Sequence, residues 1–322
     1  FAMKSREIVK RAIHFQDPPR LPYNFDSNRT PEDGISYGED MIWVSAAKRT
    51  LAGGQNEWGV VYETLDDVSF GEPKVFPLAG KESLDGYVFP DFSEDWRYEE
   101  IRRAVRENNG ERYVLGMLPT GLFQHMIDLF GFNDFLINVG INPDFVGEVC
   151  DHLLAIDKTV AEKMAACGVD GILTLDDAAL QDRLMISMEA FNTIFKPRFA
   201  KLYEHCHTLG LDTFIHSCGY TIDIIEEWID AGCDVINLDQ QDNMGIDELA
   251  RRYRGRICFY CPLDIQRTVG MGKEEIAARV KQMVEAFTNG HGGLIAKTYP
   301  QPRAVGMTDE YLKTMTDEFK KY

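Results

Sequence analysis

The fold is decided by two similar stretches, Asp170-Gly171-Ile172-Leu173-Thr174-Leu175-Asp176-Asp177 and Asp212-Thr213-Phe214-Ile215-His216-Ser217-Cys218-Gly219. Each is a short apolar run between polar residues, which is typical of a buried β-strand. Residues 190–209, which lie between them, carry apolar side chains at helical spacing. A strand, a helix and a second strand in this order predict two neighbouring parallel strands joined by a crossover helix.

The same alternation continues on both sides of this unit. Further strands are predicted at residues 20–25, 112–116, 234–238, 256–260 and 293–296, and further helices at 145–167, 221–231 and 274–288. Gly168, Gly210 and Gly232 stand where helix C-caps belong. Seven strands in 322 residues suit an α/β fold, a (β/α)8 TIM barrel, although the eighth strand has no clear signal. A doubly wound open sheet is the alternative, but no Gly-x-Gly-x-x-Gly follows an early strand.

The chain shows no linker, and we predict a single domain over residues 1–322. Residues from about 28 to 95 differ from the rest in composition, because they are rich in Gly, Asp, Pro and aromatic residues and their apolar residues show weak periodicity. They are interpreted as an irregular N-terminal insertion into the barrel.

The charge balance excludes some classes of partner. Lys and Arg number 34 and Asp and Glu number 52, for a formal net charge of −18. Phosphate backbones and anionic lipid surfaces repel such a chain, so neither nucleic acid nor membrane is an expected partner. No apolar run is long enough to span a bilayer, and residues 1–7 lack the apolar segment of a signal peptide. We therefore expect a cytoplasmic protein whose seven scattered cysteines are mostly reduced.

Polar residues follow five consecutive predicted strands, at the barrel end where catalytic groups gather. They are Asp176 and Asp177; His216 and Cys218; Asp239 and Gln240; Cys261; and Lys297 and Tyr299. Solvated loops would give a similar pattern, but the concentration of His, Cys and Asp favours a functional rim. One of the two adjacent aspartates would also serve as an ordinary N-cap for the next helix.

His216 and Cys218 form the sharpest local signal. Residues two apart on an extended segment project from the same face, and imidazole and thiolate are both zinc ligands. Cys261, at another strand end, is the nearest candidate for a third ligand, although a core thiol is an equal reading. Asp176, Asp177 and Glu226 are oxygen-ligand alternatives. In contrast, His205-Cys206-His207 lies in a predicted helix, where these residues face different sides.

These motifs together resemble those of the uroporphyrinogen decarboxylase superfamily. The resemblance spans nearly the whole chain and is carried by residues 18–22, 57–59, 170–177, 186–191, 197, 215–219, 232–240, 260–266 and 289–295. It implies a distorted βα barrel and one of two activities. True decarboxylases of this superfamily bind a porphyrinogen through an N-terminal Arg-Gln-Ala-Gly-Arg element. Residues 21–29 lack that element, and Arg29 alone is a poor carboxylate clamp.

The other branch implied by the resemblance is the corrinoid-dependent methyltransferases. Its thiol methylases carry a His-x-Cys…Cys zinc site, of which His216 and Cys218 match the first two positions. The third cysteine should fall near residues 298–301 and is missing there, which favours the methyl-donor side, similar to O-demethylases.

The resulting hypothesis is a zinc-assisted transfer of methyl from a small methylated compound to cobalamin on a corrinoid protein. Zinc would bind His216, Cys218 and Cys261, and the catalytic residues would be Asp176 and Asp177. The substrate-binding residues would be Asp239, Gln240, Lys297, Tyr299 and Tyr23. Tetrapyrrole decarboxylation and an inactive tetrapyrrole- or corrinoid-binding module are the alternatives.

Overall fold

Eight parallel strands and their crossover helices form the body of the molecule. A computed structural model describes residues 3–25, 28–30, 34–47, 54–63 and 71–322. The parallel strands are β1 (Tyr23–Asn24), β4 (Met41–Ser45), β8 (Tyr113–Met117), β9 (Gly171–Leu175), β10 (Asp212–His216), β11 (Val235–Asn237), β12 (Cys258–Cys261) and β13 (Leu294–Lys297). They follow chain order around the sheet. The predicted α/β barrel is therefore confirmed.

The eighth strand, which the sequence pattern did not locate, is β4. It pairs in parallel with β8 along its whole length, from Met41 opposite Tyr113 to Ser45 opposite Met117. It lies inside the stretch 28–95 that we interpreted as irregular, so that interpretation is corrected for these residues. The antiparallel strands β3 (Ile35–Tyr37) and β2 (Asn28–Thr30) extend the sheet beyond β4.

The barrel departs from a regular ladder where β1 and β4 meet. These two strands are the ends of the parallel run, and the Asp40 N–H donates to the Tyr23 carbonyl between them (3.3 Å). Inside this seam the Trp43 indole N–H donates to the Tyr260 hydroxyl (3.2 Å). The side chains of Trp43 on β4 and Tyr260 on β12 thus meet in the barrel interior beside this seam.

Alternation along the strands separates two apolar clusters. The inward cluster fills the barrel and contains Met41, Trp43, Tyr113, Leu115, Leu173, Phe214, Val235, Cys258, Tyr260 and Ile295. Residues of opposite parity, such as Ile172, Ile215 and Phe259, belong to the cluster between sheet and helices. Because side chains point to alternate faces, a residue's parity decides whether it reaches the barrel interior.

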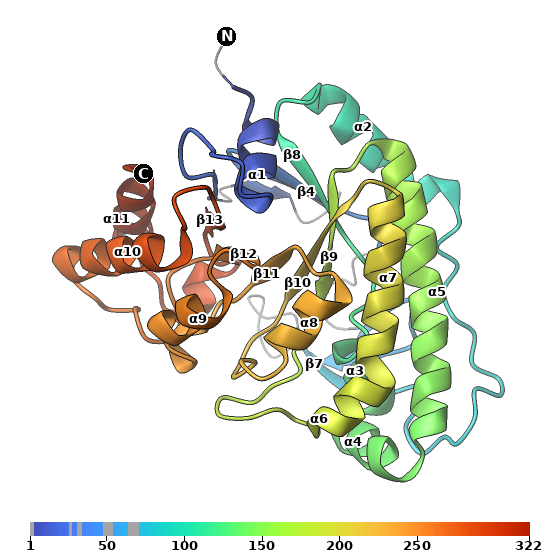
Figure 1. Cartoon of the computed structure of the whole chain (residues 1–322). Helices are drawn as coiled ribbons and strands as arrows, with labels where there is room; N and C mark the ends of the chain where they lie inside the picture. The colour runs from blue at the N-terminus through green and yellow to red at the C-terminus, as the bar shows by residue number, and fades with distance from the viewer. Residues whose placement is uncertain (1–2, 26–27, 31–33, 48–53, 64–70) are drawn as a thin grey trace.

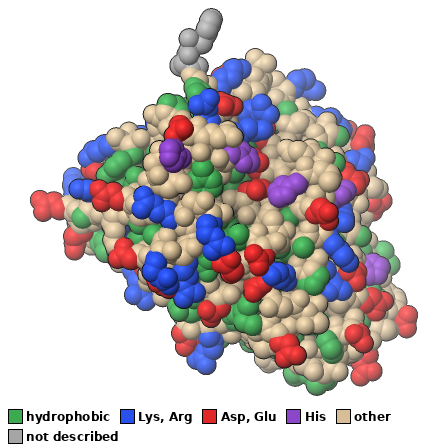
Figure 2. Space-filling view, viewed as in Figure 1, with side chains coloured by type: hydrophobic (Ala, Val, Ile, Leu, Met, Phe, Trp, Pro, Cys, Tyr) green, Lys and Arg blue, Asp and Glu red, His purple; other side chains and the backbone are tan. Residues whose placement is uncertain are grey.

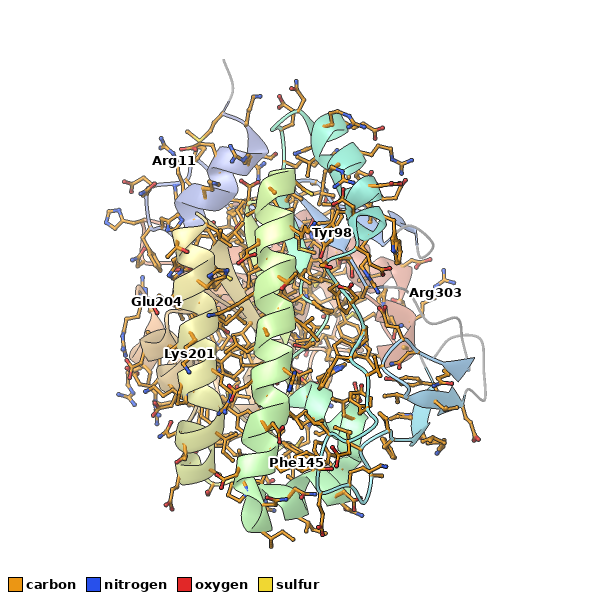
Figure 3. All side chains as sticks on the ribbon, turned by 90° about the vertical axis from the view of Figure 1, so that its right-hand side faces the viewer. Arg11, Tyr98, Phe145, Lys201, Glu204 and Arg303 are labelled. Atoms are coloured by element: carbon orange, nitrogen blue, oxygen red, sulfur yellow. The ribbon has the colours of Figure 1, made fainter. Side chains whose placement is uncertain are left out.

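The helices cover the outside of the sheet (Figure 1). They are α2 (Glu99–Asn108), α3 (Gln124–Phe130), α4 (Phe132–Ile141), α5 (Pro143–Cys167), α6 (Met188–Ala190), α7 (Lys196–Thr208), α8 (Ile225–Ala231), α9 (Ile246–Tyr253), α10 (Lys273–Phe287) and α11 (Asp309–Phe319). A π-helical turn, Phe191–Phe195, joins α6 to α7. Figure 3 shows α5 and α7 side by side, with Lys201 and Glu204 on the exposed side of α7. Gly168 and Gly232 end α5 and α8 in the left-handed conformation, as predicted.

The two ends of the barrel differ. Helix α1 (Ser5–Ile13) closes the amino end, where Val9, Ala12 and Ile13 join the interior cluster. The carboxyl end carries the loops that follow each strand. A separate antiparallel sheet, formed by β5 (Gly54–Gln55), β6 (Val61–Glu63) and β7 (Glu72–Val75), comes from the segment between β4 and β8. Among the described residues, no helix is both long and apolar enough to cross a bilayer.

Candidate functional site

Three ligand-type side chains meet at the carboxyl end of β9 and β10. His216 is the last residue of β10, and its parity is that of the interior residue Phe214. Cys218 follows two residues later, and its backbone N–H donates to Asp177 Oδ1 (2.6 Å). This bond fixes the loop after β10 against the loop after β9. Asp177, His216 and Cys218 thereby form the group of metal-ligand type found among the described residues.

The three ligand atoms lie within 4.8 Å of one another, and two of their separations match those of a tetrahedral zinc site. Cys218 Sγ lies 3.6 Å from His216 Nε2, which lies 3.6 Å from Asp177 Oδ1. Ordinary zinc bond lengths at tetrahedral angles require separations of about 3.3–3.6 Å between such atoms. His216 and Cys218 are partly buried, whereas Asp177 opens to solvent. The set therefore suits zinc with a fourth position left for a substrate atom.

Polar side chains from β11, from the loop after it and from β13 lie behind His216. Its Nδ1 lies 2.9 Å from Asn237 Oδ1 and 4.0 Å from Asp239 Oδ2. The Lys297 ammonium donates to Asn237 Oδ1 (3.2 Å) and to Asp239 Oδ1 (3.1 Å). All three supporting side chains are buried. They form a fixed polar backing for the imidazole.

Electrostatics differ on the two sides of the imidazole. Burial opposes ionisation of Asp239, but Lys297 and His216 together hold the pKa of its carboxyl below the ordinary value. Burial, assisted by Asp177 and Asp239, raises the pKa of the Cys218 thiol well above the ordinary value. Without a bound cation the thiol therefore keeps its proton. A metal ion would have to displace that proton, because the thiolate is the ligand.

The structure does not bring Asp176 into this group. Its Oδ1 accepts hydrogen bonds from the Phe123 and Gln124 backbone N–H groups (2.7 and 2.8 Å), at the start of α3. Burial raises the pKa of Asp176 to about 7 against these hydrogen bonds. A capping role was the alternative reading of the sequence, with the difference that Asp176 caps a helix that precedes it in the chain.

Cys261 and Tyr23 also lie away from the three ligands. Cys261 belongs to the cluster between sheet and helices, whereas its neighbour Tyr260 points inward. Tyr23 pairs with Ala296, stacks on Phe25 and packs against the same outer cluster. In both strands the residue of opposite parity is the one that enters the barrel, so neither side chain contacts the site from this position.

Of the remaining predicted site residues, some lie next to His216 and others lie away from it. Asp239 and Lys297 lie behind His216, as described above. The Gln240 side-chain oxygen accepts from the Gly219 N–H (2.9 Å) and the Gln181 amide (3.1 Å), so it joins the loops after β9 and β10. Tyr299 is partly buried against the outer cluster.

Sequence reasoning missed Asn237 and Leu175. Both lie inside predicted strands, where they read as ordinary strand residues. Leu175 is the register partner of His216 on β9 and is 37% exposed, so it forms an apolar wall beside the imidazole. One signal marked Asn237 in the sequence: it is a polar residue between apolar neighbours on a predicted strand.

Comparisons with known proteins agree with this architecture. The family model for uroporphyrinogen decarboxylase (URO-D) matches residues 71–298. A methyltransferase from Methanosarcina mazei superposes with a TM-score of 0.76 and 16% identity over 99% of both chains. Xylanase 10B from Thermotoga maritima superposes with a TM-score of only 0.43 and 12% identity, over 74% of this chain and 81% of that one. No curated protein matches the sequence. Because the family model covers most of the chain, the protein belongs to the uroporphyrinogen decarboxylase family.

Proposed function

We propose that the protein is a methyltransferase that moves a methyl group from a small methylated donor, such as a methyl ether, to cobalamin carried by a corrinoid protein. The observation that carries this proposal is the group formed by Asp177, His216 and Cys218 at the open end of the barrel. The likeness in fold to a methyltransferase supports it. In this proposal zinc binds these three residues, and Asp177 takes the place that we first gave to Cys261.

The transfer balances without an external oxidant. The carbon–oxygen bond of the donor breaks, and its electron pair stays on the oxygen, which gains a proton and leaves as an alcohol. A reduced corrinoid on the partner protein would supply the electron pair that accepts the methyl group. Zinc, when bound, supplies Lewis-acid polarisation of the donor oxygen.

The chain's own residues position the donor. The Cys218 N–H donates to Asp177 Oδ1, so these two residues are held next to each other at the carboxyl end of the barrel, where a donor would enter. The side chain of Leu175 is available to contact the apolar part of a donor beside His216. A donor with one oxygen and an apolar body is the class that this arrangement favours.

The corrinoid protein would dock at the same end of the barrel, because the methyl group must reach the site through the mouth. Helix α4 supplies an apolar surface there: Phe132, Ile137 and Ile141 are exposed. A hollow of about 500 Å³ separates α4 from residues 185–190, in the segment that follows β9. We propose this surface as the docking face.

Tetrapyrrole decarboxylation stays the second candidate, because the matching family model carries that name. A porphyrinogen with many carboxylates needs free cations. Inside the described part of the barrel, Lys297 is already neutralised by Asp239. The side chain of Arg29 lies outside the described residues. A cytoplasmic location stays a prediction.

The metal content of the purified protein tests the proposal. We expect about one zinc ion per chain in the wild type, and loss of most of it in His216→Ala, Cys218→Ala and Asp177→Asn. Cys261→Ala is the matched control, because it removes a thiol of the same region and should keep the metal. A wild type without zinc after purification free of chelators would contradict the metal centre.

Turnover separates the remaining alternatives. Methyl transfer from a panel of methyl ethers to free cob(I)alamin is followed by the visible spectrum of the corrinoid. Cys218→Ala should abolish turnover and leave corrinoid binding intact. Binding without turnover in the wild type would favour the inactive module, and release of CO₂ from a porphyrinogen would favour the decarboxylase.

A further inference from the structure

We propose that Asn237 is a positioning residue that selects the tautomer of His216, with the proton on Nδ1 and the lone pair of Nε2 directed at Asp177 and Cys218. The part of this inference that concerns metal affinity rests on the proposed function. The tautomer itself is a property of the metal-free chain. Asn237 contacts neither the donor nor the metal in this proposal and acts through His216.

The orientation of the Asn237 amide is fixed from one side by acceptors. Its Nδ2 donates to the Tyr260 carbonyl (2.7 Å) and to Asp239 Oδ1 (3.0 Å). A backbone carbonyl only accepts, and an ionised carboxylate also only accepts. The amide nitrogen must therefore point toward Tyr260 and Asp239, and the amide oxygen must point the other way.

Lys297 fixes the same orientation from the opposite side. Its ammonium group has donors only, and it lies 3.2 Å from Asn237 Oδ1. A reversed amide would place an NH₂ group against this ammonium and an oxygen against the Tyr260 carbonyl. Two independent partners thus require that Oδ1 is the atom facing His216.

An acceptor that faces His216 Nδ1 determines where the imidazole carries its proton. Asn237 Oδ1 lies 2.9 Å from Nδ1, so Nδ1 must be the N–H donor. A neutral imidazole has one donor and one acceptor nitrogen, and Nε2 is then the acceptor. The atoms near Nε2 are Cys218 Sγ and Asp177 Oδ1, both at 3.6 Å.

This arrangement prepares the site before any ligand arrives. Asn237, Asp239 and Lys297 are all buried, so their hydrogen bonds do not exchange with bulk water. A histidine ligand whose second nitrogen is held by an outer partner typically binds metal 10–100-fold more tightly than one without it. We expect Asn237 to make a contribution of this size.

The tautomer is measurable by long-range ¹H–¹⁵N NMR on zinc-free protein labelled at its histidines. The spectrum also distinguishes a neutral imidazole from an imidazolium, in which both ring nitrogens carry a proton. We expect the protonated-nitrogen shift at Nδ1 of His216 and the unprotonated shift at Nε2, with the signal assigned by its loss in His216→Gln. A proton on Nε2, or an even mixture of tautomers, in the wild type would overturn the inference.

Variants of Asn237 test its role directly. Asn237→Leu, which has a similar shape and no acceptor, should lose the Nδ1 preference and weaken zinc binding about 10–100-fold in competition with a chelator. Gln241→Leu is the control for a general packing effect, because Gln241 is a buried amide bonded to the Pro262 carbonyl.

The two proposals fail in different ways. A wild type that shows the Nδ1-protonated tautomer but binds no zinc contradicts the metal centre and leaves the role of Asn237 standing. An unchanged tautomer in Asn237→Leu contradicts that role, whatever the zinc content.

Discussion

The ion pair between Lys297 and Asp239 lies inside the barrel, where the two side chains are only 3% and 2% exposed. Removing one partner of a buried pair leaves an uncompensated charge and typically costs about 3–5 kcal/mol. Lys297→Met should therefore lower the free energy of unfolding by this amount in urea denaturation at pH 7. The double variant Lys297→Met/Asp239→Asn should recover part of the loss. Equal stability of the two variants would show that the charge of Asp239 is not the cause.

Leu175 allows a test of donor specificity at the scale of one residue. Leu175→Asn removes an apolar contact beside His216 without touching a proposed ligand. We expect kcat/KM for a methyl ether with an apolar body to fall about tenfold, the usual effect of one apolar contact, while methanol is affected little. Zinc content should be unchanged. An equal fall for both donors would mean that Leu175 does not contact the donor.

At this scale the sequence indicated which residue types could bind a ligand, but it did not indicate to which face of a strand each side chain points. The structure brings His216 and Cys218 together, as their local spacing predicted, and this spacing does not depend on the exact strand boundaries. Cys261 and Tyr23 were misplaced because a shift of one residue in a strand exchanges its faces. The adjacent pair Asp176 and Asp177 shows the same effect: Asp177 joins the ligand group and Asp176 caps α3.

At the scale of elements, aspartates mark the amino ends of several strands and are paired with cations. Asp170 contacts Arg6 and Lys10 of α1, and Asp40 contacts Arg20. Asp212 and Asp234 are instead paired with histidines, His14 (2.9 Å) and His207 (2.8 Å). The amino end of the barrel therefore holds two pairs that depend on pH.

The sign of this pH dependence follows from the imidazoles. The hydrogen bonds to Asp212 and Asp234 raise the pKa of His14 and of His207, against partial burial. Their stabilisation is complete below the ordinary pKa of about 6.5 and is lost as the pH rises through the raised values. Each imidazole is over 40% exposed, so each pair contributes at most about 1 kcal/mol.

The double variant His14→Gln/His207→Gln should therefore flatten the fall in unfolding free energy above pH 6.5. The measurement is denaturant unfolding of wild type and variant at a series of pH values. Parallel curves for the two proteins would remove the histidine pairs as the cause.

Strand β4 shows why one element escaped sequence reasoning. Its first four residues, Met41-Ile42-Trp43-Val44, are all buried, yet they form a short run in a segment rich in turn residues. In the part of the chain that the structure describes, no helix follows β4 closely, so the strand–helix alternation that identified the other strands is missing here. The six strands from β8 to β13 were found because each one is followed by a helix.

At the scale of the whole molecule, the net charge of −18 describes the surface as a whole but did not indicate where a partner docks. Helix α4 is one of the places where the structure exposes large apolar side chains. Ile141 of α4 is 78% exposed and Ile137 is 54% exposed. Figure 2 shows apolar side chains at the lower edge of the molecule, where Figure 1 places α4. The start of α3 is hydrogen-bonded to Asp176, directly after β9, and α3 leads into α4 across the single residue Gly131. This surface therefore lies on the same side of the barrel as the end of β9 and the ligand group.

The proposed docking face predicts a selective loss. Ile137→Arg and Ile141→Arg place a charge in the apolar surface and should slow methyl transfer to a corrinoid protein by tenfold or more, whereas transfer to free cob(I)alamin should be unchanged. Met3→Arg, at an apolar position that is 37% exposed and precedes α1 at the opposite end, is the control. If the α4 variants slow both reactions alike, the helix supports the site itself. If they slow neither reaction, the corrinoid protein docks on another side of the carboxyl end of the barrel.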